Sequence, residues 1–406
     1  MRRSCAIRWQ RWPSRSDMRS AKIVIESRRG SAALLLASCA GMADLIALPI
    51  SVGTLIASFG FDPQQAGFLM MLFLGGVVAA STALAPHFPR LPGRAVAAAG
   101  YGLSAIGFFW AAAQSEFYVL AVLLSGCGLA SGAALTVTNG TIARSARPHR
   151  LYAAVSTALG VFGVLLLGAT PLIASVVGGQ AVFLVLGAVK ALAALVALAW
   201  FPSRPVGDNK AAPTVVSRIP LLVWFGIAGI AAMSIVHAMT SSFLVQVGAH
   251  RGFDAVAVNG VLIAIGLVSL LPGPLSAALE TRWPARRVLL GGAVLQVLLV
   301  TVVMTAPGFT PYAVAAALFP SVMVFTHTFA FGLLAASDPS GRSLAATPAM
   351  LMAGAALGAL LGGTLVKLFG FSSIAVAAAC LAAFALLCFS RLPSGGAAHS
   401  SQEVPA

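Results

Sequence analysis

Twelve long apolar runs follow one another along the chain, separated by short polar or Pro/Gly-rich breaks. Each run is close to the roughly 20 residues that an α-helix needs to cross the hydrocarbon core of a bilayer. A membrane β-barrel would instead show segments of about ten residues with alternating apolar and polar positions. The pattern predicts an all-α membrane protein whose twelve transmembrane helices lie near residues 32–58, 65–86, 95–114, 117–141, 151–176, 180–201, 219–247, 256–279, 287–306, 311–335, 344–368 and 371–390.

The longest internal polar stretch lies between the sixth and the seventh apolar runs. We therefore expect an N-terminal six-helix bundle over 31–202, a linker over 203–218 and a C-terminal six-helix bundle over 219–390. Residues 1–30 and 391–406 would be tails. The first tail is rich in Arg and Ser and poor in acids, as transit peptides are. We expect a disordered cytoplasmic tail instead, and Met18 is an alternative start.

A sequence repeat relates the two predicted bundles. Gly60-Phe61-Asp62 recurs as Gly252-Phe253-Asp254, and Arg90-x-Pro92-x-Arg94 recurs as Arg282-x-Pro284-x-Arg286. Both matches have an offset of 192 residues, and both fall in equivalent breaks of the two halves. Two matches in register predict a duplicated six-helix unit.

The composition agrees with a bilayer as the solvent. Hydrophobic residues make up 59% of the 406 residues, and only 9% are charged, against about a quarter in a soluble domain. The net charge of +15 could suggest nucleic-acid binding, but the basic residues do not cluster with aromatics on a soluble face. We therefore expect no nucleic-acid partner. The five cysteines form neither a disulfide framework nor a zinc motif.

The distribution of Lys and Arg predicts the orientation of the chain. The two tails and the breaks after the even-numbered runs carry 22 of the 25 basic residues. Because cytoplasmic loops of membrane proteins are enriched in Lys and Arg, both termini and the linker are expected to be cytoplasmic. The protein would be multi-pass in the inner (plasma) membrane, and the lipid headgroups would be partners of its basic loops.

These features together resemble the major facilitator superfamily. That family has two six-helix halves, a central cytoplasmic linker, and a loop after the second span that reads Gly, three residues, Asp-Arg-x-Gly-Arg-Arg. Here Arg90 and Arg94, and Arg282 and Arg286 in the second copy, match its arginines, whereas its acid and glycines are missing. The resemblance covers residues 31–390. It implies an alternating-access transporter whose site lies near the bilayer midplane between the halves, lined by spans 1, 4, 7 and 10.

An ionisable side chain at bilayer depth is costly and is a functional hypothesis by default. Asp44 lies about halfway along the first span, shortly before Pro49. It could exchange a proton or bind a cationic group of a substrate. The alternative is a structural carboxylate bonded to a neighbouring Ser or to the backbone. Lys190 lies in the sixth span, outside the family's cavity, where we expect snorkelling or a structural pair.

The second half offers histidines instead of an acid. His237, midway along the seventh span, lies one position from the repeat equivalent of Asp44, so an acid and an imidazole could face each other at similar depth. Histidine titrates near physiological pH. The alternative is a packing histidine whose ring nitrogens are satisfied by Ser234, Thr240 or Ser241.

Three further polar positions complete the candidates. His327 lies between two threonines in the tenth span, where it could bind substrate or join helices. Thr136 and Asn139 lie in the fourth span and could contact substrate. The substrate and proton-binding candidates are thus Asp44, His237, His327, Thr136, Asn139, Thr240 and Ser241.

The function expected from these residues is secondary active transport of a small solute, coupled to protons. The chain lacks the GxxxxGK[ST] loop of ATP-driven transport, and it has no nucleophile–base pair or metal-ligand cluster, so neither an enzyme nor a cofactor is expected. With no arginine inside the spans for a phosphate, a small amphipathic or hydrophobic compound is favoured, and efflux is one candidate direction. We expect a monomer. The alternative is a transport-inactive membrane sensor or scaffold with the same fold.

Overall fold

The computed structural model describes residues 27–145, 148–202, 221–279, 282–337 and 342–392, so both predicted tails, apart from a few residues, and the whole predicted linker lie outside the described residues. The described part is helical throughout. Its elements are α2 (Arg28–Ile46), α3 (Leu48–Ala57), α4 (Pro63–Leu84), the 3-10 helix η1 (Ala85–Arg90), α5 (Gly93–Ala111), α6 (Phe117–Ala143), α7 (Pro148–Val177), α8 (Ala181–Trp200), α9 (Leu221–His250), α10 (Ala255–Val268), α11 (Pro272–Leu279), α12 (Ala285–Thr305), α13 (Phe309–Ser337), α14 (Arg342–Phe369) and α15 (Ser372–Ser390).

Each predicted run contains a helix, but two runs are interrupted. The first is divided at Ala47 into α2 and α3, and Pro49 lies in the first turn of α3. Proline is tolerated there because its missing N–H would have no partner inside the helix. The eighth run, predicted as one helix over 256–279, is divided into α10 and α11, with Pro272 at the start of α11. Hydropathy does not register these interruptions near proline, so it predicts one continuous helix where the structure has two.

Eleven of the described helical segments are long and apolar enough to cross a membrane. Helix α5, which corresponds to the predicted span 95–114, is not among them. It has 19 residues, and its mean hydropathy is lowered by Arg94 in the first turn and by its glycines. At about 1.5 Å per residue its length is nevertheless close to 30 Å, and it packs along α6 and α8. It therefore completes a set of twelve spans.

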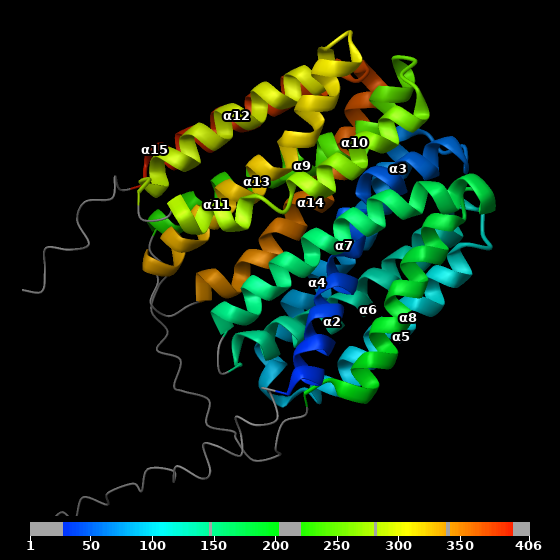
Figure 1. The fold of residues 1–406 in the computed structure, drawn as a ribbon, viewed down its shortest axis with the longest axis vertical. Helices are drawn as coiled ribbons and strands as arrows, with labels where there is room; N and C mark the ends of the chain where they lie inside the picture. The colour runs from blue at the N-terminus through cyan, green and yellow to red at the C-terminus, as the bar shows by residue number, and fades with distance from the viewer. Residues whose placement is uncertain (1–26, 146–147, 203–220, 280–281, 338–341, 393–406) are drawn as a thin grey trace, which may run out of the picture.

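The spans form two groups of six that lie side by side, α2–α8 and α9–α15 (Figure 1). The groups are joined where α4 packs on α14, α7 on α10 and α11, and α3 on α9. We call the end of the bundle that carries Asp62 the Asp62 end, and the end that carries Arg94 and Arg286 the basic end.

The 192-residue repeat is visible in the backbone of the two groups. All four described glycines with positive φ form two repeat pairs, Gly60 (71°) with Gly252 (72°) and Gly178 (92°) with Gly370 (77°). Each lies in a turn between two spans, where a side chain would strain the backbone. The repeat therefore preserves the turns at the Asp62 end.

The aspartates of the repeat have the same local role in both halves. Asp62 accepts a hydrogen bond from the Gln65 N–H at 2.9 Å, and Asp254 accepts one from the Ala257 N–H at 2.9 Å. Each satisfies an unpaired N–H in the first turn of its helix, as capping aspartates do. Asp62 and Asp254 are therefore the N-caps of α4 and α10.

The arginines of the loop motif divide into two kinds. Arg94 donates from Nε to the Phe201 carbonyl oxygen at 3.2 Å, and Arg286 donates from Nη2 to the Ser390 carbonyl oxygen at 2.7 Å. In each half the second arginine therefore binds the C-terminal end of the sixth span, where a cation is favourable for the helix dipole. Arg90 and Arg282 are exposed.

We expect Arg286→Ala to lower the free energy of unfolding by about 1 kcal/mol, because the carbonyl groups at the end of α15 lose a charged donor. The matched control is Arg282→Ala, which removes an exposed arginine of the same motif. Thermal unfolding in detergent compares the two variants. Equal shifts of the midpoint in both would contradict a capping role for Arg286.

Candidate functional site

The N-terminal half contains a buried ion pair between α2 and α8. The Lys190 ammonium lies 2.7 Å from Asp44 Oδ2, and neither side chain has more than 6% of its surface exposed. Lys190 also donates to Ser131 Oγ at 2.9 Å and to the Ala40 carbonyl oxygen at 3.2 Å. All three N–H donors of the ammonium group therefore have an acceptor.

The surroundings of the pair place it inside the N-terminal half. The Lys190 ammonium lies 5.4 Å from the ring centroids of both Phe73 on α4 and Phe108 on α5. Such contacts favour a desolvated cation. Asp44 Oδ1 has no hydrogen-bond partner among the described residues. The pair is neutral as a whole, and one oxygen of the carboxylate remains unused.

These contacts change the two expectations from the sequence. Lys190 does form a pair, as one of the two predicted alternatives stated, but the partner of Asp44 is Lys190 rather than a neighbouring Ser. Sequence reasoning did not connect them, since they are 146 residues apart. The available signal was charge balance, because each is the one mid-span charge of its sign in this half.

The other half shows that the fold does not require this ion pair. At the 192-residue offset, Asp44 corresponds to Val236 and Lys190 corresponds to Ala382. Both are buried hydrophobic residues. The same architecture is therefore built once with a salt bridge and once with apolar side chains at these positions.

The C-terminal half brings the two predicted histidines together on α9 and α13. The His237 ring is stacked on Phe319 with centroids 5.0 Å apart, and the His327 ring lies 4.9 Å from that of Phe331. Both histidines are half-buried, and they interact electrostatically with each other. The Nδ1 atom of His237 is buried without a partner among the described residues. The Nδ1 atom of His327 also lacks a partner with hydrogen-bond geometry, but its ring interacts with the Met323 backbone one turn earlier in α13. Neither nitrogen is satisfied by a nearby hydroxyl.

Unpartnered polar atoms are concentrated on the same two helices. Buried polar groups in proteins are nearly always hydrogen-bonded, to protein or to water. Eight buried side-chain N or O atoms in the described part lack a partner, and five of them lie on α9 and α13: His237 Nδ1, Thr240 Oγ1, Ser321 Oγ, Thr326 Oγ1 and His327 Nδ1. We call His237, Thr240 and His327 the histidine site, because the Thr326 side chain faces Gly292 of α12 instead. Ser241, also predicted, is buried next to Thr240.

The predicted residues of the fourth span have another environment. Thr136 donates its hydroxyl to the Gly132 carbonyl oxygen at 2.8 Å, one turn earlier in α6. Asn139 is half-buried on the same helix. No interaction described for the structure connects either of them with Asp44 or with the histidine site. Among the described residues, no three His, Cys, Asp or Glu side chains are grouped as a metal site would need.

A second salt bridge joins the two halves at the Asp62 end. Lys367 on α14 lies 2.9 Å from Asp62 Oδ2, and it donates to Gln64 Oε1 at 3.2 Å. Partial burial of Asp62 opposes its ionisation, but the Gln65 N–H and the Lys367 ammonium outweigh this and lower the pKa of Asp62 below its ordinary value. The carboxylate is therefore charged throughout the neutral range.

Glycines permit the close packing of α4 against α14 near this salt bridge. A Cβ on Gly67 would collide with the Ala359 carbonyl oxygen, and one on Gly363 would collide with the Pro63 carbonyl oxygen. Backbones can approach this closely in membrane proteins where one of them carries a small residue. The contact between the halves at the Asp62 end therefore depends on these two glycines.

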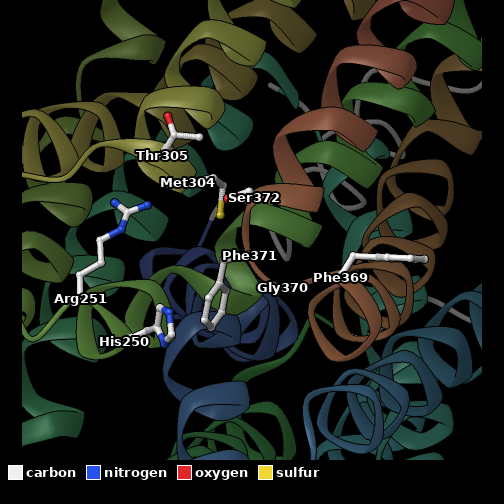
Figure 2. A pocket seen from close by; sticks show the side chains of 8 residues that line it. All are labelled: His250, Arg251, Met304, Thr305, Phe369, Gly370, Phe371 and Ser372. Atoms are coloured by element: carbon white, nitrogen blue, oxygen red, sulfur yellow. The ribbon is translucent and has the colours of Figure 1, made fainter.

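An open cavity of about 490 Å³ lies at the Asp62 end of the C-terminal half (Figure 2). Arg251 and His250 line one side, and the Arg251 guanidinium donates to the Val303 carbonyl oxygen at 3.1 Å. Figure 2 shows the Phe369 side chain directed away from these residues. Along α9, His250 is 13 residues or about 20 Å from His237, so this cavity is separate from the histidine site.

Comparisons with known proteins agree with the geometry. Residues 33–347 match the family model described as Major Facilitator Superfamily. No curated protein sequence matches the chain significantly. Among solved structures, a bacterial homolog to the human lysosomal transporter Spinster, in an inward-facing and unoccupied conformation, has a TM-score of 0.70 and 14% identity, covering 89% of this chain and 96% of that one. The nucleoside transporter NupG has a TM-score of 0.68 and 14% identity, covering 89% and 97%. At these identities the structures show a shared fold.

Proposed function

The chain belongs to the major facilitator superfamily, and we propose that it carries a small amphipathic solute across the inner membrane by alternating access, coupled to protons. The observation that supports this most is the set of ionisable side chains inside the spans, Asp44, Lys190, His237 and His327. Such groups are costly within a bilayer and are retained for function. We also propose that the protein acts as a monomer with bundles 31–202 and 219–390.

The arrangement of the halves supports a specific state of the transport cycle. The salt bridge and the glycine contacts join the halves at the Asp62 end. The basic residues of the opposite end are expected on the cytoplasmic side. We therefore assign the structure to an inward-facing state, closed at the Asp62 end. The bacterial Spinster homolog of the same fold was solved in an inward-facing conformation.

Asp44 and Lys190 could couple a proton to this cycle. Protonation of Asp44 removes the charge that holds Lys190, and the ammonium then keeps only Ser131 and the Ala40 carbonyl as acceptors. Because α2 and α8 are joined by this pair, its loss would change their packing. The apolar residues at the equivalent positions of the other half indicate that stability alone does not explain the pair.

The test is transport in proteoliposomes under a pH gradient, with a solute found by a ligand-dependent thermal-shift screen. We expect Asp44→Asn to abolish proton-driven accumulation or to leave only downhill transport, because the amide cannot exchange a proton. Asp254→Asn is the control, since it makes the same change at an N-cap outside the spans. Accumulation by Asp44→Asn equal to that of the wild type would overturn the role of Asp44.

Loss of the second salt bridge should favour opening at the Asp62 end. An exposed pair of this kind contributes about 0.2–1 kcal/mol, so Lys367→Gln is expected to raise the open population by up to about fivefold. Spin labels at Tyr118 and Val256, both highly exposed and on different halves, would report the separation. No change in their distance distribution would contradict a gating role for Lys367.

The same labels test the pH dependence of this contact. Because the pKa of Asp62 is lowered in the folded protein, its ionised carboxylate stabilises the folded state. This stabilisation is present at a pH above the ordinary Asp pKa of about 4, and it is lost as the pH falls through the lowered pKa. The salt bridge should therefore persist between pH 5 and pH 8. A change of the distance distribution in that range would have to come from another group.

A further inference from the structure

The described helices that surround the histidine site carry no acidic residue. Helices α3, α10, α11, α12, α14 and α15 pack on α9 or α13, and none of these eight helices contains Asp or Glu. Besides the two histidines, the basic residues of these helices are Arg286 and Arg287 at the basic end, Arg342 at the start of α14, and Lys367 and His250 at the Asp62 end. The other titratable residues are Cys380 and Cys388 on α15 and Tyr312 on α13. The Tyr312 hydroxyl donates to the Leu244 carbonyl oxygen at 2.8 Å. A protonated His237 or His327 would have no carboxylate beside it on these helices.

The carboxylate of the other half does not supply this charge either. Asp44 is the one acid within the described helices of the N-terminal half, and Lys190 lies 2.7 Å from it. The pair is neutral, so it attracts a cationic solute weakly. The charge distribution within the spans therefore varies from neutral to positive as the histidines gain protons.

From this distribution we propose that the solute is a small organic monoanion, such as a carboxylate with an apolar body, which binds at the histidine site together with one proton. This proposal rests on the proposed transport function and names the class of its substrate. The bound anion would be the counter-ion of one imidazolium, with the hydroxyl of Thr240, one turn after His237 on α9, as a further donor. Phe319, whose ring is stacked on His237, would face the apolar body.

The physical basis of the coupling is reciprocal linkage. An anion that binds the protonated site more tightly must also favour protonation of that site by the same factor. Two adjacent imidazolium ions repel each other, so one proton per anion is expected rather than two. Transport of one anion with the proton of one imidazolium would be electroneutral, and a further proton carried by Asp44 would add one positive charge. No arginine lies within the central part of the spans to bind a multiply charged anion in bidentate fashion.

The experiment uses the purified full chain in detergent and compounds that differ in charge. One set is benzoate, benzamide, benzylamine and phthalate, and a second is the linear carboxylates from acetate to decanoate with their amides. Titration calorimetry in two buffers of different ionisation enthalpy measures affinity and the protons taken up per bound molecule. We expect binding of at least one monocarboxylate with about one proton taken up near pH 7, and at least tenfold weaker binding of its amide, amine and dianion counterparts.

The variants assign the binding to the site. His237→Gln and His327→Gln should each lower the affinity for that monocarboxylate at least tenfold, and the double variant should remove the proton uptake, while thermal unfolding reports whether each variant is folded. His250→Gln is the matched control, since it changes the same residue type at the far end of α9. Failure of every monocarboxylate to bind, binding without proton uptake, or unchanged affinity in both variants would overturn the proposal.

A second readout separates this proposal from the transport function. In proteoliposomes, histidine-dependent uptake of an amide or an amine would overturn the anion class and leave the transport function supported. Binding of a monocarboxylate with no flux of any compound would instead contradict transport and leave the assigned site supported.

Discussion

Replacement of Lys190 by methionine is expected to lower the free energy of unfolding by about 3–5 kcal/mol, because it leaves the Asp44 carboxylate buried without a counter-ion. The loss is large since Lys190 is fully buried and donates to Asp44, Ser131 and Ala40 at once. Protonation of Asp44 would reduce the loss but would also fix the carboxyl group in its neutral form.

The double variant Asp44→Val with Lys190→Met should recover most of this stability. It reproduces the apolar character of Val236 and Ala382, which occupy the equivalent positions of the other half. Replacing a buried ion pair by apolar side chains of similar volume is often neutral or stabilising. We expect the double variant to unfold within about 1 kcal/mol of the wild type and to have lost proton-driven accumulation.

The wild type, Asp44→Val, Lys190→Met and the double variant form one mutant cycle. Thermal and denaturant unfolding measure the stability of each. Lys367→Met is the control, because it removes a lysine from an exposed salt bridge, where the expected change is below about 1 kcal/mol. A double variant as unstable as Lys190→Met would show that packing, rather than the unpaired charge, is responsible. A double variant with wild-type proton coupling would exclude the pair from the mechanism.

The features that the sequence predicts well are those determined locally. The twelve spans follow from hydropathy, and the repeat places Gly60 and Gly252 in equivalent breaks, whereas the capping role of Asp62 and Asp254 is seen in the structure. The breaks at Ala47 and before Pro272 are harder to predict. Hydropathy is averaged over many residues, so it does not show a short interruption. A proline does not mark a break either, since Pro171 and Pro320 lie inside continuous helices.

The candidate site could be predicted only in part. His237 and His327 were recognised, and the structure brings them together. The expected pairing of Asp44 with His237 across the two halves is not what the structure shows, since Asp44 binds Lys190. A shift of one residue turns a side chain by about 100° around a helix, so near-equivalent positions in the repeat face different neighbours. Contacts between distant helices depend on such rotations, which a single sequence does not reveal.

The glycines between the halves carry the second large prediction. Gly363→Ala places a Cβ against the Pro63 carbonyl oxygen of α4, and Gly67→Ala places one against the Ala359 carbonyl oxygen of α14. Neither contact involves a flexible side chain that could move away, so the helices must separate at the Asp62 end. Overpacking of this kind costs about 1–3 kcal/mol, which corresponds to a factor of about 5–150 in the population of the closed state.

Gly75→Ala is the matched control for this prediction, because Gly75 lies on α4 and nothing would approach its Cβ within 4 Å. There the added methyl group should only favour the helix, by up to about 1 kcal/mol. Spin labels at Tyr118 and Val256 should show a longer separation in Gly363→Ala and Gly67→Ala than in Gly75→Ala. A transporter that must close at this end should also lose most of its flux in the first two variants. If all three variants had the same distance distribution, the halves would not be held together by the α4–α14 contact, and closure would have to depend on the packing of α3 with α9 and of α7 with α10.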